Sequence, residues 1–597
     1  MKKQLNKLVA VLLTGVMAVS ILPLNSFAAV GTGEKAVASR RTGQVTFYQD
    51  GALSDAYLEG DWTEQYTAPE EGTFEGDLYK GLEKFEDCIF LANYPLPEDE
   101  AVDCYQRVIN SNPDLFYVSG NLSYFLLDYC VDCNGFVYYD EENGNWLYVV
   151  DLTYDANTGN ARIFFSTDPC NHRLAHNYYG ALYAFLPQYI TNNKNQISAM
   201  KSRFDTAVKD ALAGIDENMS DLDKALYCHD YIVKSNNYDY QNFLADAVPT
   251  VSHSAYGALV NRVSVCDGYA LAYSYLLQKL GIETRLVTST AMAHAWSAVE
   301  LDGEWYFVDC TGDDIIDSYS NAADSDRFDV VYHDTFLMSE ALLSSTWYSD
   351  GPYRGWAQTD IVANSTKYDD AYWRLIAGDD EENPVIQWGV TNEYGYCDGY
   401  WYYVDDITYN IMKTNDPTKA GEVYSTLIKD AWITWGGWLD GYKKPACFGK
   451  ASVHTPSKTM YVSDAERIYA IDLTQEEAEP EVYYEYTDEY YEYTDNSYIY
   501  GITVVDDYLY LGIANSPYEK ETLSPRFIGE IQKGDVDGDG FISTDDAFQV
   551  LRLVTTGKKS FSFLVEAAKI NSNDSNDKPA TDDASQILKF TVSGNFN

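Results

Sequence analysis

Three residues of the 597-residue sequence could together form the catalytic centre of a thiol enzyme: Cys266, His294 and Asp309. Acyl transfer needs a nucleophile, a base that takes its proton, and a group that orients the base. Cys266 stands directly before a predicted helix, where the helix dipole favours a thiolate. Taken singly, each residue also has a structural interpretation: a buried thiol, a core imidazole and a strand-end cap.

The sequence around His294 and Asp309 predicts a β-hairpin that brings the two side chains together. Two strand-like runs flank Asp302-Gly303, a dipeptide typical of two-residue hairpin turns. With that turn, Asp309 is expected opposite Trp296 and diagonal to His294 on the same face of the sheet. A shift of the register by one residue would move Asp309 to the other face.

The elements that would position these residues follow from the spacing of apolar side chains. Apolar residues recur at helical spacing over 197–211 and 222–233, and Ser220 and Asp223 stand in capping-box register before the second run. Gly281 is the expected end of the helix behind Cys266. Strands are expected over three ranges: 284–288, 295–301 and 304–310. This block is therefore expected to be α+β.

The same stretch resembles the bacterial transglutaminase-like (papain-like) superfamily of thiol enzymes. The resemblance covers residues 200–320 and rests on separated motifs that occur in the family's order: 223–226, 229–233, 238–240, 255–260, 265–270, 294–296 and 305–311. It implies Cys266 as the nucleophile, His294 as general base and acid, and Asp309 as the residue that orients His294. The implied chemistry is attack on a protein or peptide amide to form a thioester, which water or an amine resolves without a catalytic cofactor.

The oxyanion of such a reaction needs hydrogen-bond donors. We expect the backbone N–H of Cys266 to be one donor, and Tyr256 is a candidate for another. The alternative interpretation of Tyr256 is a core aromatic residue packed under the catalytic helix. Cys310, next to Asp309, is expected to point to the opposite face and to be structural.

A second chemical pattern, near the C-terminus, has the spacing of a calcium loop. Gly540 stands at the sharp turn, and the predicted Ca²⁺ ligands are Asp535, Asp537, Asp539, the Phe541 carbonyl, Ser543 and Asp546. A helix is expected directly behind this loop, and residues 544–553 are repeated at 581–590. The repeat has its own oxygen-bearing residues, Asn571, Asn573, Asp577 and Asp583. This second loop lacks the glycine and has one extra residue, so a second calcium ion is not firmly predicted.

The duplicated loop and helix resemble a type I dockerin, a family that binds cohesin modules of scaffold proteins. The resemblance implies a small α-helical, calcium-binding module over 534–597, with Thr544 and Asp545 at partner-reading positions. It also implies a cohesin-bearing assembly such as a cellulosome, in a context of polysaccharide breakdown. A free-standing calcium-stabilised cap is the alternative.

Charge and composition exclude several classes of partner. The 92 acidic and 41 basic side chains give a net charge of −51, which argues against nucleic acid and anionic membrane surfaces, because both need a basic patch. An apolar content of 46% excludes a disordered chain.

The first residues predict a signal peptide. They contain Lys2 and Lys3, an apolar run up to Leu22, and the cleavage motif Ser26-Phe27-Ala28. We therefore expect a secreted protein with no membrane span after cleavage.

Five segments are expected along the chain. They are a signal peptide (1–28), a loosely ordered segment (29–76), a transglutaminase-like domain with an N-terminal extension (77–345), a Tyr-rich β region (365–529) and the dockerin (534–597). The β region has three similar strand-like units, at 399–405, 459–464 and 506–511, which favour a propeller-like repeat. Its duplicated run at 483–496 is either an aromatic ligand-binding strip or an acidic Tyr-rich loop.

Cysteine usage leaves alternatives open. The ten cysteines of an expected secreted chain invite disulfides, but their density is low. Five residues could bind zinc, form a disulfide in part, or be idle thiols: Cys130, Cys133, Cys170, His172 and His176. Their spacing matches no zinc pattern.

The predicted function is a secreted cysteine protease, amidase or acyltransferase tethered through its dockerin. The rival is a catalytically inactive scaffold-associated protein whose β region holds a polymer or cell-wall ligand.

Overall fold

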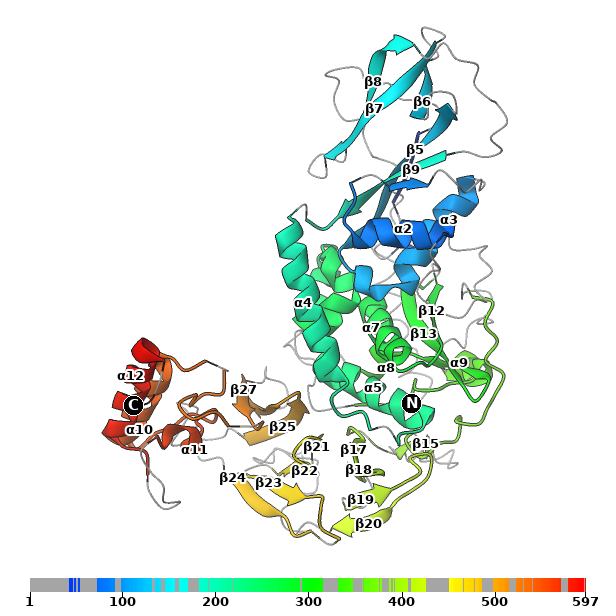
Figure 1. Cartoon of the computed structure of the whole chain (residues 1–597). Helices are drawn as coiled ribbons and strands as arrows, with labels where there is room; N and C mark the ends of the chain where they lie inside the picture. Colours follow the sequence, from blue (N-terminus) through cyan, green and yellow to red (C-terminus); the bar gives the residue numbers. More distant parts are fainter. Residues whose placement is uncertain are drawn as a thin grey trace. The chain divides into compact units, whose positions relative to one another are not determined.

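The computed structural model divides the chain into two compact units (Figure 1). The first comprises Met1–Val208, Tyr238–Thr311 and Leu337–Thr366, and the second Lys209–Asn237, Gly312–Phe336 and Lys367–Asn597. The structure describes residues 42–46, 48–49, 52–53, 72–87, 89–91, 98–130, 135–140, 145–155, 160–169, 182–191, 193–216, 218–289, 292–314, 331–346, 357, 359–374, 376–377, 386–387, 390, 392–405, 410–425, 450–464, 467–476, 478–485, 498–514, 522–529, 531–539, 541–570, 578–594 and 596. The predicted signal peptide lies outside these ranges. Within them, none of the helices has the length and apolar character needed to cross a membrane.

The N-terminal part of the first unit contains a seven-stranded antiparallel sheet in the order β4-β9-β5-β6-β7-β8, with β1 paired to β5. Its strands are β1 (Thr42–Thr46), β4 (Ile89–Leu91), β5 (Val118–Cys130), β6 (Gly135–Asp140), β7 (Asn145–Asp155), β8 (Asn160–Pro169) and β9 (Leu182–Tyr189). Two helices, α2 (Phe74–Glu83) and α3 (Glu98–Ser111), accompany it. Within the segment 29–76, which the sequence predicts to be loosely ordered, β1 pairs with β5. Composition could not reveal that distant strand partner.

The predicted catalytic residues lie on a helix and a small sheet of the first unit. Helix α7 (Cys266–Lys279) packs beside the sheet of β12 (Thr284–Ser289), β13 (His294–Leu301) and β14 (Glu304–Val308) (Figure 1). Cys266 is the first helical residue, as predicted, and Gly281, with φ +78°, follows the helix end. Residues 267–277 are buried, which fixes α7 in the core.

The other face of this small sheet packs on a second core, which joins strand residues to the segment after β14. Trp296 and Phe307 contribute to this core together with Met338 and Leu343, the latter on α9 (Glu340–Thr346). The predicted strand over 304–310 is too long, because β14 ends at Val308 and Cys310 begins the short helix α8 (Cys310–Asp313). An extended pattern in the sequence does not show where a chain turns into a helix.

The second unit contains helix α5 (Asp221–Ser235) and most of the described strands after residue 366. Ser220 caps α5, with Asp223 in the predicted reciprocal capping box. The Tyr-rich region forms separate antiparallel sheets rather than a closed barrel among the described strands: β17-β18-β19-β20, β21-β22-β23-β24 and β25-β26-β27. Each of the three predicted units contributes the second strand of its sheet, namely β18 (Tyr400–Val404), β22 (Thr459–Ser463) and β26 (Tyr508–Ala514).

The end of the chain folds around a duplicated pair of helices. The repeated sequence forms α10 (Thr544–Thr556) and α12 (Thr581–Ser593), which share one apolar core with residues such as Val550 and Ile587. Asp546 accepts hydrogen bonds from two backbone N–H groups ahead of α10, and Asp583 does the same ahead of α12. The duplication seen in the sequence is therefore also a duplication of local structure.

The remaining described elements are short or connect these parts. They are β2 (Tyr48–Gln49), β3 (Ala52–Leu53), η2 (Pro113–Leu115), α4 (Lys194–Ala211), β10 (Asn237–Tyr238), α6 (Tyr240–Leu244), η3 (Thr250–His253), η4 (Gly257–Asn261), β11 (Val263–Ser264), β15 (Ile376–Ala377), β16 (Ile386–Gln387), β17 (Gly395–Cys397), β19 (Ile411–Thr414), β20 (Glu422–Ser425), β21 (Lys450–His454), β23 (Arg467–Asp472), β24 (Glu481–Glu485), β25 (Tyr498–Val505), β27 (Thr522–Phe527) and α11 (Val565–Ala568).

Candidate functional site

The hairpin of β13 and β14 carries two of the three predicted catalytic residues. Ser297 pairs with Val308 and Leu301 with Glu304, so the register is the predicted one. The turn residues Asp302 and Gly303 have φ of +57° and +81°, the left-handed pair that a two-residue hairpin turn requires. The register therefore places Asp309, just after β14, beside the start of β13.

His294 lies between Asp309 and the predicted nucleophile. Its Nε2 atom is 2.8 Å from Asp309 Oδ2, and the other Asp309 oxygen accepts a hydrogen bond from the backbone N–H of Thr311. Cys266 is near enough to raise the pKa of His294, and the contact of Nε2 with Asp309 leaves the Nδ1 atom of the ring for the thiol. The Cys266 side chain is partly exposed and forms no disulfide. The contact between His294 and Asp309 confirms the predicted side-chain pairing.

The electrostatics around His294 favour its protonated form. Burial lowers the pKa of His294, but the charge of Asp309, its hydrogen bond and the contact with Cys266 together outweigh burial and raise the pKa well above its ordinary value. The ring also stacks on Trp296, with centroids 5.7 Å apart. An oriented imidazolium next to a thiol is the arrangement that can hold a thiolate and then supply a proton to a leaving amine.

Sequence reasoning gave no role to Tyr238, which lies close to the nucleophile. Burial raises the pKa of Tyr238 well above its ordinary value, and the charges of Cys266 and Asp267 raise it further. The phenol therefore stays neutral near Cys266. The signal that could have found it is the short pairing of β10 with β11, the strand that leads into Cys266.

Tyr256, the residue proposed from sequence as an oxyanion donor, lies in the aromatic core. It is 3% exposed, its ring centroid is 4.6 Å from that of Phe116, and it stacks with Phe204 at 6.4 Å. These contacts correspond to the alternative interpretation of Tyr256 as a core aromatic residue.

The predicted calcium loop brings three carboxylates together. Oxygen atoms of Asp535, Asp537 and Asp539 lie within 4.8 Å of one another. Burial, followed by the charges of Asp546 and Asp539, raises the pKa of Asp537 to about 6. Asp537 Oδ1 is buried and has no hydrogen-bond partner among the described residues. Both features fit a cation, because Ca²⁺ would neutralise the mutual repulsion and bind the orphaned oxygen.

The other predicted loop residues are placed differently. Asp546 accepts hydrogen bonds from the backbone N–H groups of Val536 and Ser543, so its carboxylate organises the loop and the start of α10. Phe541 is 74% exposed, and its N–H donates to Asp539. Thr544 and Asp545 are exposed in the first turn of α10. Of the second predicted loop, Asn571, Asn573 and Asp577 lie outside the described residues, and Asp583 caps α12.

Five cysteines are described as free thiols: Cys104, Cys228, Cys266, Cys310 and Cys397. Burial raises the pKa of the Cys104 thiol to about 12 and that of Cys397 to about 11. The possible zinc or disulfide group predicted from the sequence lies outside the described residues. This holds for Cys133, Cys170, His172 and His176 and for the side chain of Cys130.

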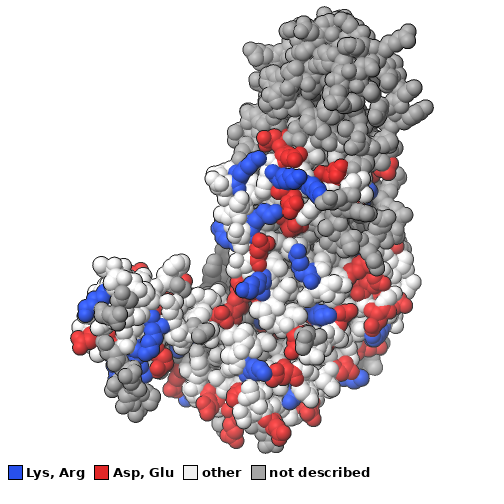
Figure 2. Space-filling model, viewed as in Figure 1, with Lys and Arg blue, Asp and Glu red and all other residues white. Residues whose placement is uncertain are grey.

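The described surface carries acidic and basic side chains together. In the view of Figure 2, Asp and Glu side chains are spread over the visible described surface with Lys and Arg among them. No large basic patch is visible on the described part of that face.

Comparison with known proteins agrees with the geometry around Cys266. Residues 209–310 match the family described as Transglutaminase-like superfamily, and this stretch contains all three predicted catalytic residues. The match thus identifies a transglutaminase-like domain within the chain, over residues 209–310. No curated protein matches the chain.

Two solved structures are similar to part of the chain. One is described as the crystal structure of a TGase; the two are 13% identical, with a TM-score of 0.18, over 28% of this chain and 45% of that one. The other is described as a candidate protease from Parabacteroides distasonis; it is 12% identical, with a TM-score of 0.14, over 29% of this chain and 36% of that one. This chain thus spans less than half the length of either protein.

Proposed function

We propose that the chain is a secreted cysteine enzyme that cleaves or transfers acyl groups of protein or peptide amides. The observation that carries the proposal is the 2.8 Å contact of His294 with the Asp309 carboxylate, with Cys266 near enough to raise the pKa of His294. A nucleophile, a base and an orienting carboxylate in contact are what thioester chemistry needs. The match of residues 209–310 to a transglutaminase-like family supports the same chemistry.

The reaction follows from the roles of these groups. The Cys266 thiolate attacks the amide carbonyl carbon, and the oxyanion is met by donors at the start of α7, where backbone N–H groups lack helical partners. The neutral phenol of Tyr238 is placed to add a further hydrogen bond. Protonated His294 gives its proton to the departing amine, the C–N bond breaks, and a thioester on Cys266 remains.

The second half of the reaction regenerates the thiol. His294, now neutral, takes a proton from water or from an amine that attacks the thioester, and the Cys266 thiolate leaves. Water gives hydrolysis, and an amine gives a crosslinked product. We propose hydrolysis as the main outcome, because water is abundant outside the cell and the sequence contains no recognisable amine site.

We further propose that the C-terminal module is a calcium-dependent dockerin that tethers the enzyme to a cohesin-bearing scaffold. The duplicated helices α10 and α12 and the carboxylates of Asp535, Asp537 and Asp539 support this assignment. Thr544 and Asp545 are exposed, as partner-reading residues must be. Three of the four described sheets of the Tyr-rich region each contain one repeated strand, and these three sheets support a propeller-like organisation.

A substrate assay tests the proposed chemistry. The full chain is incubated with labelled peptides in the presence and absence of labelled amines, and wild type is compared with Cys266→Ala. We expect peptide turnover by the wild type and none by the variant, because the thioester cannot form. Equal turnover by both would refute the catalytic assignment. Absence of turnover by both would favour the inactive, polymer-binding alternative.

A further inference from the structure

A buried cluster of two imidazoles and a carboxylate lies in the second unit, apart from the proposed catalytic residues. His229 and Asp230 are on α5, and His333 belongs to the segment 331–336. His229 Nδ1 and His333 Nε2 each lie 2.9 Å from the same oxygen, Asp230 Oδ1. The three residues are 0%, 3% and 1% exposed. One donor atom from each residue therefore meets at one point inside the protein.

We propose that His229, Asp230 and His333 form a binding site for a divalent transition-metal cation such as Zn²⁺. A set of two imidazoles and one carboxylate favours such borderline cations over Ca²⁺ and Mg²⁺. Metal–ligand bonds of about 2.1 Å hold neighbouring ligand atoms roughly 3.0 to 3.4 Å apart, close to the spacing seen here. Without a metal, a proton must lie between the nitrogen and the oxygen in each of these two N···O contacts. In the proposed site the cation replaces those protons.

The surroundings of His229 have the arrangement that supports a metal-binding imidazole. Its other nitrogen, Nε2, lies 3.0 Å from Asp313 Oδ2, and Asp313 is itself held by the backbone N–H of Thr335. A carboxylate on the far nitrogen fixes the tautomer, so the near nitrogen presents its lone pair to the cation. Asp230 is oriented in the same way, because its Oδ2 accepts a hydrogen bond from the Tyr394 N–H at 2.6 Å.

His333 gains most from a bound cation. Its Nδ1 atom is buried and has no hydrogen-bond partner among the described residues. A buried imidazole with one nitrogen unpaired carries a desolvation cost that a single hydrogen bond at Nε2 offsets only in part. A coordinate bond at Nε2 offsets more of that cost.

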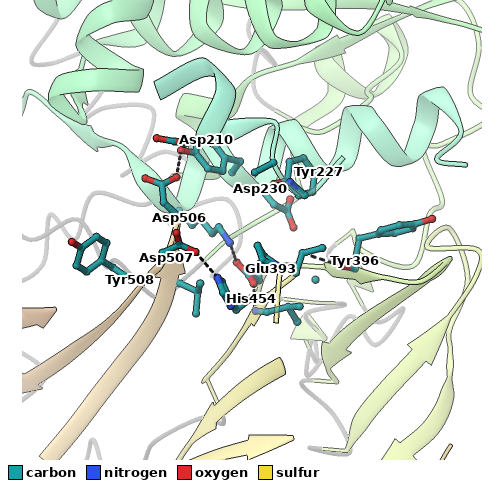
Figure 3. Close-up of a pocket in the computed structure, with 18 of the residues that line it drawn as sticks. Asp210, Tyr227, Asp230, Glu393, Tyr396, His454, Asp506, Asp507 and Tyr508 are labelled. Carbon is teal, nitrogen blue, oxygen red and sulfur yellow. Dashed lines mark hydrogen bonds and ion pairs between the residues drawn. The ribbon is translucent and has the colours of Figure 1, made fainter. Parts of the chain in front are cut away.

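A cavity lies next to one member of the cluster, Asp230. Its volume is about 260 Å³, and Figure 3 shows it together with Glu393, Asp506 and Asp507. Glu393 is already paired with Lys234, which also lines the cavity. A cavity of this size can hold water, which is the further ligand that the proposed site would use. The bound ion would tie α5 to segment 331–336, which lies 103 residues from Asp230 in the sequence.

Metal analysis of the full-length, untagged chain tests the proposal. The protein is equilibrated with Zn²⁺ in the presence of calcium, dialysed, and analysed by mass spectrometry for bound zinc. We expect wild type to retain zinc and His333→Gln to lose it. His253→Gln is the matched control, because His253 is also an imidazole in contact with a carboxylate, Asp267, and belongs to neither of the candidate metal-binding groups among the described residues. It should retain zinc as wild type does.

Two results would overturn the proposal. One is a wild-type chain that retains no zinc, which would make the cluster a hydrogen-bond network alone. The other is equal retention by wild type and His333→Gln. X-ray absorption at the zinc edge of the wild type needs no variant, and so it decides the matter if His333→Gln does not fold. We expect a shell of nitrogen and oxygen with imidazole scattering, whereas sulfur ligands would place the metal on cysteines instead.

Discussion

His294 Nε2 lies 2.8 Å from Asp309 Oδ2, at the open end of a hairpin whose turn is Asp302-Gly303. The contact joins a residue at the start of one strand to a residue just past the end of the next. Its geometry is therefore set by the register of the hairpin rather than by a local loop. The first two predictions concern this contact.

Replacing Asp309 by asparagine should reduce turnover strongly while leaving the fold intact. The asparagine side chain has nearly the same shape, but it cannot stabilise an imidazolium as a carboxylate does, and it can select the wrong tautomer of His294. A loss of about 10²- to 10⁴-fold in kcat is expected from the behaviour of comparable triads. Steady-state kinetics on a labelled peptide measures it. Asp302→Asn is the control, since that residue is exposed in the turn and asparagine also adopts positive φ. An unchanged kcat in Asp309→Asn would contradict the role of Asp309.

Replacing Gly303 by valine should destabilise the first unit. Gly303 has φ +81°, and a Cβ there would meet no atom within 4 Å, so the cost comes from the backbone conformation alone. We expect a loss of about 1–2 kcal/mol, because β-branched residues disfavour the left-handed region. Gly399, with φ +85° in the β17–β18 turn, is equally unobstructed and serves as the comparison. Thermal unfolding should show similar losses for both variants, but only Gly303→Val should impair turnover. Impaired turnover in both variants would show that the register of the β13–β14 hairpin is not what turnover depends on.

Some features of the fold and of the candidate site could be predicted from the sequence for physical reasons. The contact between His294 and Asp309 follows from strand alternation and a two-residue turn, which leave a single register. The start of α7 at Cys266 follows from helical spacing. Tyr238 was not assigned a role, because nothing local shows that β10 pairs with β11 beside Cys266. The meeting of Asp230 with His333, across 103 residues, is likewise a tertiary contact without a local pattern.

Domain membership was equally hard to predict. Residues 209–237 and 312–336 fall within one predicted domain, yet they group with the Tyr-rich region in the second unit. The contacts responsible are specific and distant in sequence, such as the hydrogen bond from Trp401 Nε1 to Asp223 at 2.8 Å. Hydrophobic periodicity identifies the helix that contains Asp223, but it does not identify the partner against which that helix packs.

Removing calcium should loosen the C-terminal module. Asp535, Asp537 and Asp539 lie close together, and without a cation their charges repel one another. A chelator should make residues 534–597 sensitive to proteolysis and release the protein from a cohesin-bearing scaffold. Asp537→Ala should abolish the protection given by calcium, whereas Asp545→Ala, an exposed acidic residue on α10, should keep it. Scaffold binding that survives the chelator would contradict the calcium-dependent tether.

Acid should destabilise the second unit through His454. Burial lowers the pKa of His454, although Asp507 is 3.0 Å away and opposes the effect. The folded state therefore favours neutral imidazole, and its contribution to stability is lost as the pH falls below about 6.5, where the unfolded chain takes up the proton. Between pH 7 and 5 we expect the free energy of unfolding of wild type to fall more than that of His454→Gln, as measured by urea unfolding. A difference in the free energy of unfolding between wild type and His454→Gln that does not change with pH would contradict this prediction.

The central claim is that Cys266 is an activated nucleophile, and thiol labelling separates it from the other described cysteines. Burial raises the pKa of Cys104 to about 12 and that of Cys397 to about 11, so these thiols stay protonated and slow at neutral pH. Cys266 is partly exposed and in contact with His294. A large difference in reactivity towards iodoacetamide is therefore expected.

The most direct test is the rate at which iodoacetamide modifies each cysteine at pH 7, mapped by mass spectrometry in the wild type, His294→Gln and, as a control, His454→Gln. The account predicts that Cys266 reacts much faster than Cys104 and Cys397, that His294→Gln slows Cys266 to a rate near theirs, and that His454→Gln leaves it fast. Labelling of Cys266 no faster than that of the buried thiols, or unchanged in His294→Gln, would contradict the account.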